Sequence, residues 1–255
     1  MATTERFADI VIDIETRRPP ADSRAWAARA ARISAEPVEA PANFKDAEKI
    51  AAYIADKSAT RLTDALDKAP LDPTLGMIAC IAYAINDGEV QTIGDFDNAL
   101  TPLDAEGEIL LSLAAALRGV PRYRLIAHNG PGFDAPFIQA RALVHLAIAR
   151  RAGATDAAAT FSALVAMLGK LGGKPWDSPM VDTAALWPTC GYGASKGSAK
   201  LSDVCAALGI ERAKSIASAD VPEAWENGDR EAVRVHVVAD VAELREVWRI
   251  LRAAL

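Results

Sequence analysis

The stretch FADIVIDIET, residues 7–16, predicts the first strand of the fold and carries two candidate site residues. Residues 7–14 are rich in β-branched side chains and almost wholly apolar, which predicts a strand buried on both faces. Because side chains at positions i and i+2 of a strand share a face, Asp13 and Glu15 project together, about 6–7 Å apart along the backbone. Two carboxylates on one buried strand repel each other and are costly to desolvate, and a divalent cation offsets both effects. The alternative is a strand end that emerges into solvent.

The segments around this strand predict an α/β fold, a mixed sheet flanked by helices. A helical insertion over residues from about 20 to 70 is expected after the first strand, because this segment is rich in Ala, Lys and Glu. Asn86-Asp87-Gly88 predicts a hairpin turn. The other expected strands are 77–84, 90–93, 124–127 and 180–186, the last as a strand or a strand–helix junction. The expected helices are 103–117, 134–151, 156–170, 200–208 and 229–255.

Length and composition narrow the class of protein. The 255 residues carry a formal net charge of −6 and a pI near 5.2, which does not fit a strongly basic nucleic-acid coat protein. Residues 1–255 are expected to form a single domain that includes the insertion. No apolar run reaches the ~18 residues of a membrane span, and the first nine residues lack the apolar core of a secretory signal. We therefore expect no membrane association and a cytoplasmic location.

Two further clusters carry side chains suited to chemistry. HNGPGFD, residues 128–134, follows a predicted strand and opens a helix, so Asp134 either caps that helix or comes close to the sheet edge. On the last helix, His236 and Asp240 are four residues apart, which places them on one face. Apolar residues flank both, so a charged Asp240 needs a partner there. A His–Asp pair on the helix surface is the alternative.

Together these clusters form a specific pattern. D-x-E at 13–15, H-N-x-x-x-F-D at 128–134 and H-x-x-x-D at 236–240 resemble the three motifs of the DnaQ-like (DEDD) 3′–5′ exonucleases. Residues 181–187 and 200–210 are similar to the segments that link these motifs, and residues 41–76 resemble the insertion of phage-type members, close to the exonuclease domains of family B DNA polymerases. The resemblance implies an RNase H-like fold and metal-dependent hydrolysis at the 3′ end of single-stranded DNA.

The resemblance also implies roles for individual residues. His236 would be the general base, since an imidazole accepts a proton near neutral pH. Two Mg²⁺ or Mn²⁺ ions would be held by four carboxylates, those of Asp13, Glu15, Asp134 and Asp240. The 3′-terminal nucleotide would contact residues of the first two motifs, namely Ile14, Thr16, Asn129 and Phe133.

The third motif departs from the family pattern. One subgroup has Y-x-x-x-D and the other H-x-x-x-x-D, whereas this chain has His236 at the tyrosine spacing. An orienting or packing role for His236 is therefore the alternative to a general base. Outside the motifs, Asp182 is expected to be a turn or cap residue and His145 a packed or surface residue. Asp203 and Glu243 are expected on solvated helix faces.

The expected partners are the 3′ ends of single-stranded DNA or RNA, with a DNA polymerase or another replication protein as a further partner. One alternative function is an exonuclease that acts on RNA or short oligonucleotides. The other is a catalytically degenerate module that binds nucleic acid or a polymerase. The loops at 170–174 and 191–200 either contact phosphates or are simply solvated.

Overall fold

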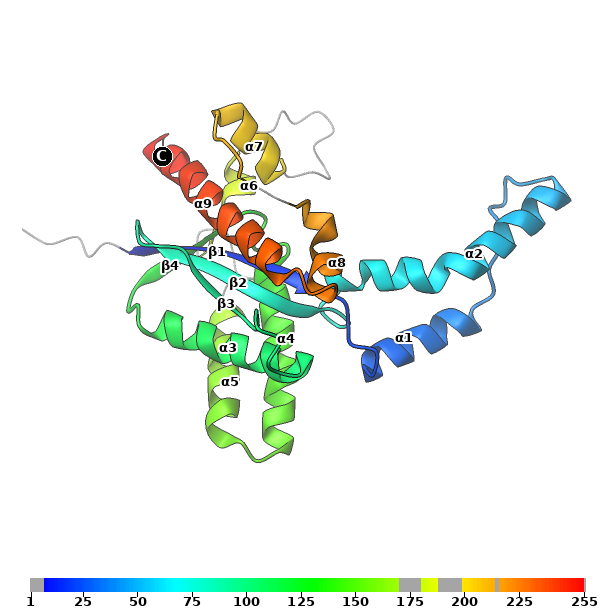
Figure 1. The fold of residues 1–255 in the computed structure, drawn as a ribbon, viewed down its shortest axis with the longest axis horizontal. Coiled ribbons are helices and arrows are strands. Elements are labelled where there is room, and N and C mark those ends of the chain that lie inside the picture. Colours follow the sequence, from blue (N-terminus) through cyan, green and yellow to red (C-terminus); the bar gives the residue numbers. More distant parts are fainter. Residues whose placement is uncertain (1–6, 170–179, 188–198, 214–215, 255) are drawn as a thin grey trace, which may run out of the picture.

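The computed structural model describes residues 7–169, 180–187, 199–213 and 216–254. Within them, one mixed sheet has the strand order β3-β2-β1-β4-β5 (Figure 1). The strands are β1 (Ala8–Arg17), β2 (Met77–Ile85), β3 (Gln91–Gly94), β4 (Tyr123–Ala127) and β5 (Met180–Asp182). β2 is antiparallel to β1 and β3, whereas β4 is parallel to β1 and β5. The sheet and its flanking helices confirm the α/β class, in an arrangement consistent with an RNase H-like fold.

Helices cover both faces of the sheet (Figure 1). One face packs against α3 (Pro102–Arg118), α4 (Asp134–Arg151) and α5 (Thr155–Gly169), and the other against α9 (Arg230–Ala254). β1 is buried on both faces, as its sequence predicts: Ile12 belongs to the core on the α3 side and Val11 to the core on the α9 side. Asp13 and Glu15 follow Val11 at the i+2 spacing, so the alternation of the strand turns them toward α9.

The expected helical insertion lies between β1 and β2. It contains α1 (Arg24–Ala35) and α2 (Ala47–Lys68), followed by the short 3₁₀ helix η1 (Ala69–Leu71). Neither α1 nor α2 has a buried residue, and the pair extends away from the sheet (Figure 1). At its base, Arg18 donates hydrogen bonds to Asp67 (2.7 Å) and Glu226 (2.8 Å). The insertion is therefore attached to the core at one end only, where it borders the site described below.

Shorter helices complete the chain. α6 (Thr183–Leu186) follows β5 directly, and α7 (Leu201–Leu208) ends at Gly209, whose φ of +70° is the left-handed conformation that favours glycine. The 3₁₀ helix η3 (Ser218–Asp220) and α8 (Val221–Glu226) were not predicted, because their three and six residues are too few to show a helical period. Val221 and Trp225 nevertheless bury α8 against the same core as α9. Among the described helices, none combines the length and apolar character needed to cross a lipid bilayer.

A buried ionic cluster joins α3 to α4. Glu106 is fully buried and accepts two hydrogen bonds from Arg141, at 2.9 and 2.7 Å. His145 Nε2 lies 2.9 Å from the same carboxylate, and the backbone N–H of Ile78 donates to it at 2.7 Å. Burial alone would raise the pKa of Glu106, but the hydrogen bonds from His145 and Arg141 outweigh burial and lower it. His145 is thus a packed residue, one of the two expected alternatives.

Candidate metal centre

The centre of the candidate site lies where β1 faces α9. Val233, Val237 and Val241 of α9 are completely buried against the sheet, which fixes the rotation of the helix about its axis. His236 and Asp240 lie on this inward side, with exposed fractions of 0% and 6%. The apolar stripe that anchors the helix therefore also carries two polar side chains toward the carboxylates of β1.

The second motif reaches the same place from β4. After β4, a tight turn leads into α4, and its geometry depends on Asn129, which has a φ of +63°. The backbone N–H groups of Gly132 and Phe133 both donate to the Asn129 carbonyl oxygen at 3.0 Å. A Cβ atom on Gly130 would lie 2.5 Å from the Cβ of Ala127, so this close approach requires glycine. The turn sets Asp134 at the first residue of α4, buried beside β1.

These elements line a cleft of about 370 Å³. It contains all four carboxylates that the resemblance assigns to metal ions and all four residues that it assigns to substrate. They are Asp13, Glu15, Asp134, Asp240, Ile14, Thr16, Asn129 and Phe133. The base of the insertion, including Pro70 and Leu71, forms part of the rim, and so do Ser218, Ala219, Val221 and Pro222. Segments more than 100 positions apart in the sequence therefore meet in one cleft.

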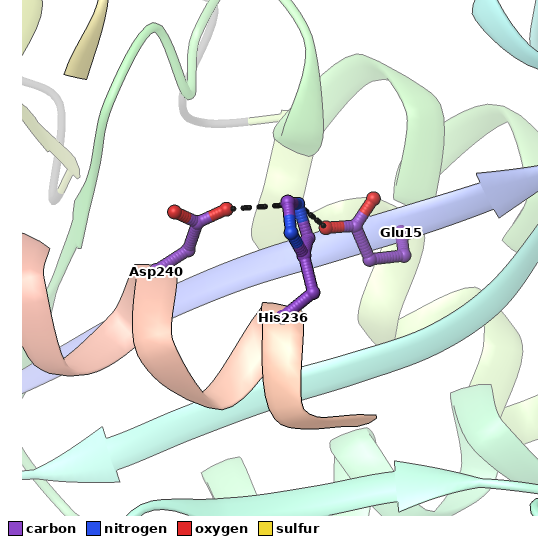
Figure 2. Close-up of side chains that lie close together, drawn as sticks. All are labelled: Glu15, His236 and Asp240. Atoms are coloured by element: carbon purple, nitrogen blue, oxygen red, sulfur yellow. Dashed lines mark ion pairs between the residues drawn. The ribbon is translucent and has the colours of Figure 1, made fainter. Parts of the chain in front are cut away.

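His236 does not line the cleft but contacts two of its carboxylates. Its Nε2 atom lies 3.3 Å from Glu15 Oε1 and 3.4 Å from Asp240 Oδ2 (Figure 2). The Ser218 hydroxyl oxygen is 3.4 Å from the same nitrogen. Figure 2 shows the imidazole between the two carboxylates, with Glu15 reaching it from β1 and Asp240 from the next turn of α9.

Burial perturbs the carboxylate of Asp134. Burial raises its pKa from 3.8 to about 7, and the charge of Asp182 adds to the rise, although the backbone N–H groups of Asp134 and Ile14 oppose it. Among the described residues, Asp134 Oδ1 has no hydrogen-bond partner. A buried carboxylate of this kind is stabilised by a nearby positive charge. Carboxylate oxygens are also the ligands that suit Mg²⁺ and Mn²⁺, so the donor set fits divalent cations.

Comparison with known proteins bears on the fold. No protein-family model and no curated protein matches the sequence. Among solved structures, the chain is similar to a family B DNA polymerase from the hyperthermophilic archaeon Pyrobaculum calidifontis, with a TM-score of 0.50 and 13% sequence identity. The match covers 95% of this chain and 24% of the polymerase, so the chain spans about a quarter of that protein's length. At this identity the similarity is one of fold.

The structure confirms the predictions for two of the three acidic residues considered outside the motifs. Asp182 is the N-cap of α6, as expected: it accepts hydrogen bonds from the backbone N–H groups of Ala184 (3.0 Å) and Asn129 (2.8 Å). Asp203 is exposed, which also agrees with the prediction. The prediction of a solvated face for Glu243 is wrong, because its side chain is only 5% exposed. This part of α9 is covered by α7 and the segment after it, a contact between distant segments that helical periodicity does not reveal.

Sequence reasoning did not find two residues that touch the site. Arg212 Nη2 lies 3.6 Å from Asp240 Oδ1, and its Nη1 lies 3.3 Å from Glu243 Oε2. Ser218 contacts His236 from the segment before α8. Neither residue belongs to a motif, and no local pattern marked them.

His128 of the second motif holds the turn in place. Its Nδ1 atom lies 2.9 Å from the Thr183 hydroxyl and its Nε2 atom 2.6 Å from the Ala199 carbonyl oxygen. Both of its nitrogens are therefore engaged. The loop at 170–174 and residues 191–198 of the second loop lie outside the described residues.

Proposed function

We propose that this protein is a metal-dependent 3′–5′ exonuclease that hydrolyses phosphodiester bonds at the 3′ end of single-stranded DNA. The observation that carries the proposal is the cleft in which Asp13, Glu15, Asp134 and Asp240 converge from β1, α4 and α9. The similarity of the fold to a family B DNA polymerase supports a function related to nucleic acid.

The four carboxylates would hold two Mg²⁺ or Mn²⁺ ions. Without cations, a cleft with four acidic groups repels a phosphodiester, and the buried Asp134 is costly to ionise. When bound, two divalent ions lower the pKa of a coordinated water and stabilise the leaving oxygen of an in-line displacement. The residues of this chain would fix the ligand positions: the β1 alternation sets Asp13 and Glu15, and the rotation of α9 sets Asp240.

The rest of the cleft suits the end of a single strand. Phe133 is partly exposed at the cleft and offers an aromatic surface on which a base can stack. Asn129 is exposed and presents an amide that can hydrogen-bond to the nucleotide. Ile14 and Thr16 are nearly buried, so they would contact the nucleotide mainly through the edge of β1.

The resemblance assigns His236 the role of general base in this reaction, because an imidazole can accept a proton near neutral pH. Its position against Glu15 and Asp240 also supports a second role, as a ligand. The two roles use the same nitrogen atom, Nε2, and exclude each other.

The decisive experiment follows the products of the reaction. The purified chain is incubated with 5′-labelled DNA and RNA oligonucleotides in Mg²⁺, Mn²⁺ or EDTA. The proposal predicts a ladder that shortens from the 3′ end and requires the metal. Asp13→Asn should reduce the rate at least ~10²-fold, whereas Glu108→Gln, an exposed residue of α3 on the other side of the sheet, should leave it unchanged.

The same experiment separates the alternatives. Cleavage of RNA or very short oligonucleotides in preference to DNA would indicate the second substrate class. Absence of cleavage on every substrate would overturn the enzyme assignment and favour a binding module. Association with a DNA polymerase or another replication protein stays a prediction of the sequence resemblance.

A further inference from the structure

The environment of His236 Nε2 contains more oxygen atoms than one imidazole nitrogen can hydrogen-bond well. Three oxygen atoms, from Glu15, Asp240 and Ser218, lie 3.3–3.4 Å from this nitrogen. A single N–H points at one acceptor, and a charge-assisted hydrogen bond is usually about 2.7–2.9 Å long. The nitrogen therefore sits at a similar distance from several oxygens and close to none of them.

The separations of the two carboxylates from Nε2 match those of atoms that share one cation. The ligand atoms of Glu15, His236 and Asp240 all lie within 4.8 Å of one another. Two ligands with bonds of ~2.1 Å to the same ion are ~3.0 Å apart in an octahedral and ~3.4 Å apart in a tetrahedral arrangement. The distances of 3.3 and 3.4 Å from Nε2 to the two carboxylates fall in that range.

A second, independent feature of the same cleft also points to a cation. Asp134 is 4% exposed and lines the same cleft, and its Oδ1 atom has no hydrogen-bond partner among the described residues. Burying a carboxylate oxygen without a donor is unfavourable unless a cation or a donor arrives with the ligand. The cleft thus brings together three buried carboxylates, those of Glu15, Asp134 and Asp240, beside the imidazole of His236.

We propose that His236 is a metal ligand through Nε2, together with Glu15 and Asp240, and that the site therefore prefers a first-row transition-metal ion to Mg²⁺. Imidazole nitrogen is a good ligand for transition metals, whereas Mg²⁺ is bound almost entirely by oxygen. The assignment deepens the proposed function, on whose metal site it rests, by naming the class of metal. It removes His236 from the role of proton acceptor, because the lone pair of Nε2 is used for the metal.

Spectroscopy of the Mn²⁺-loaded full-length protein tests this directly. Electron spin echo measurements are expected to show coupling of bound Mn²⁺ to ¹⁴N, which ¹⁵N-histidine labelling changes to the ¹⁵N pattern. The chain has three histidines. The ring nitrogens of His128 are held by Thr183 and Ala199, and His145 contacts Glu106 on the other side of the sheet. A histidine coupling is therefore assigned to His236, and this measurement needs no variant.

A matched variant adds a measure of affinity. His236→Gln keeps the approximate size of the side chain and replaces a nitrogen ligand by an amide oxygen. By titration calorimetry, it should weaken Mn²⁺ binding at least ~10-fold and change Mg²⁺ binding by less than about threefold. Glu108→Gln should bind both metals as the wild type does.

The outcomes separate this assignment from the proposed function. Bound Mn²⁺ without histidine coupling, in a protein that still degrades DNA, would overturn the ligand assignment and leave the exonuclease proposal standing. Histidine coupling in a protein that cleaves no substrate would overturn the exonuclease proposal and leave the ligand assignment standing. Failure to bind either metal would overturn both.

Discussion

Asp134→Asn is expected to stabilise the metal-free protein near neutral pH. An aspartate in the unfolded chain has a pKa of 3.8, and burial together with the charge of Asp182 raises the pKa of Asp134 to about 7 in the folded protein. Three pKa units correspond to about 4 kcal/mol, which is the most that ionised Asp134 can subtract from the free energy of unfolding. Asn keeps an oxygen to accept hydrogen bonds from the backbone and cannot be ionised.

The sign of the pH dependence follows from the direction of the shift. Between pH 3.8 and about 7 the folded protein holds a proton on Asp134 that the unfolded chain has released. This contribution to stability is therefore complete below pH ~4, declines as the pH rises and is lost above pH ~7. Asn at position 134 cannot ionise, so the variant does not lose this stability as the pH rises. The free energies of unfolding of the variant and the wild type should be alike at pH 4, and that of the variant should be higher by up to about 4 kcal/mol at pH 8.

The measurement is urea-induced unfolding in EDTA at several pH values, followed by circular dichroism. Glu108→Gln is the control, because this carboxylate is exposed and should leave the pH profile unchanged. Adding Mn²⁺ should reverse the order: the wild type gains stability from binding, and the variant gains less. If Asp134→Asn were no more stable than the wild type at pH 8 in EDTA, ionised Asp134 would not be the cost to folding that its burial implies.

Three further predictions concern the scaffold of the site. Glu106→Gln should lower the free energy of unfolding by about 3–5 kcal/mol, because it leaves the buried Arg141 without its charged partner; a loss below about 1 kcal/mol in urea denaturation would contradict this. Acid should destabilise the wild type below pH ~4, because the pKa values of Glu106 and Asp9 are lowered in the folded protein. Burial alone would raise both values, but the hydrogen bonds that the two carboxylates accept outweigh burial. The stabilisation from both groups is therefore lost as the pH falls through the lowered values. An unchanged unfolding free energy at pH 3 would contradict that assignment. Gly130→Ala should lower the free energy of unfolding by about 1–3 kcal/mol and weaken Mn²⁺ binding, because its Cβ would lie 2.5 Å from that of Ala127. A variant with the melting temperature and Mn²⁺ affinity of the wild type would contradict this prediction.

Local patterns in the sequence were sufficient for much of the fold. The apolar run of β1, the Asn86-Asp87-Gly88 turn and the periodic helices depend on residues close together in the chain, and the structure confirms them. α8 was missed because its burial depends on one valine and one tryptophan that pack against a distant strand. The partner of His145 was missed for the same reason, since Glu106 is 39 positions away.

In the candidate site, too, some features depend on local sequence and others on contacts between distant segments. Local sequence patterns placed residues within each motif: strand alternation places Asp13 with Glu15, the Gly-rich turn delivers Asp134 to the start of α4, and helical spacing places His236 with Asp240. Only the tertiary structure decided how those residues meet. The packing of α9 on the sheet buries His236 between two carboxylates, and Arg212 reaches Asp240 from a segment outside every motif. The rotation of a helix on a sheet and the approach of a distant arginine depend on contacts across the whole core, which no local pattern records.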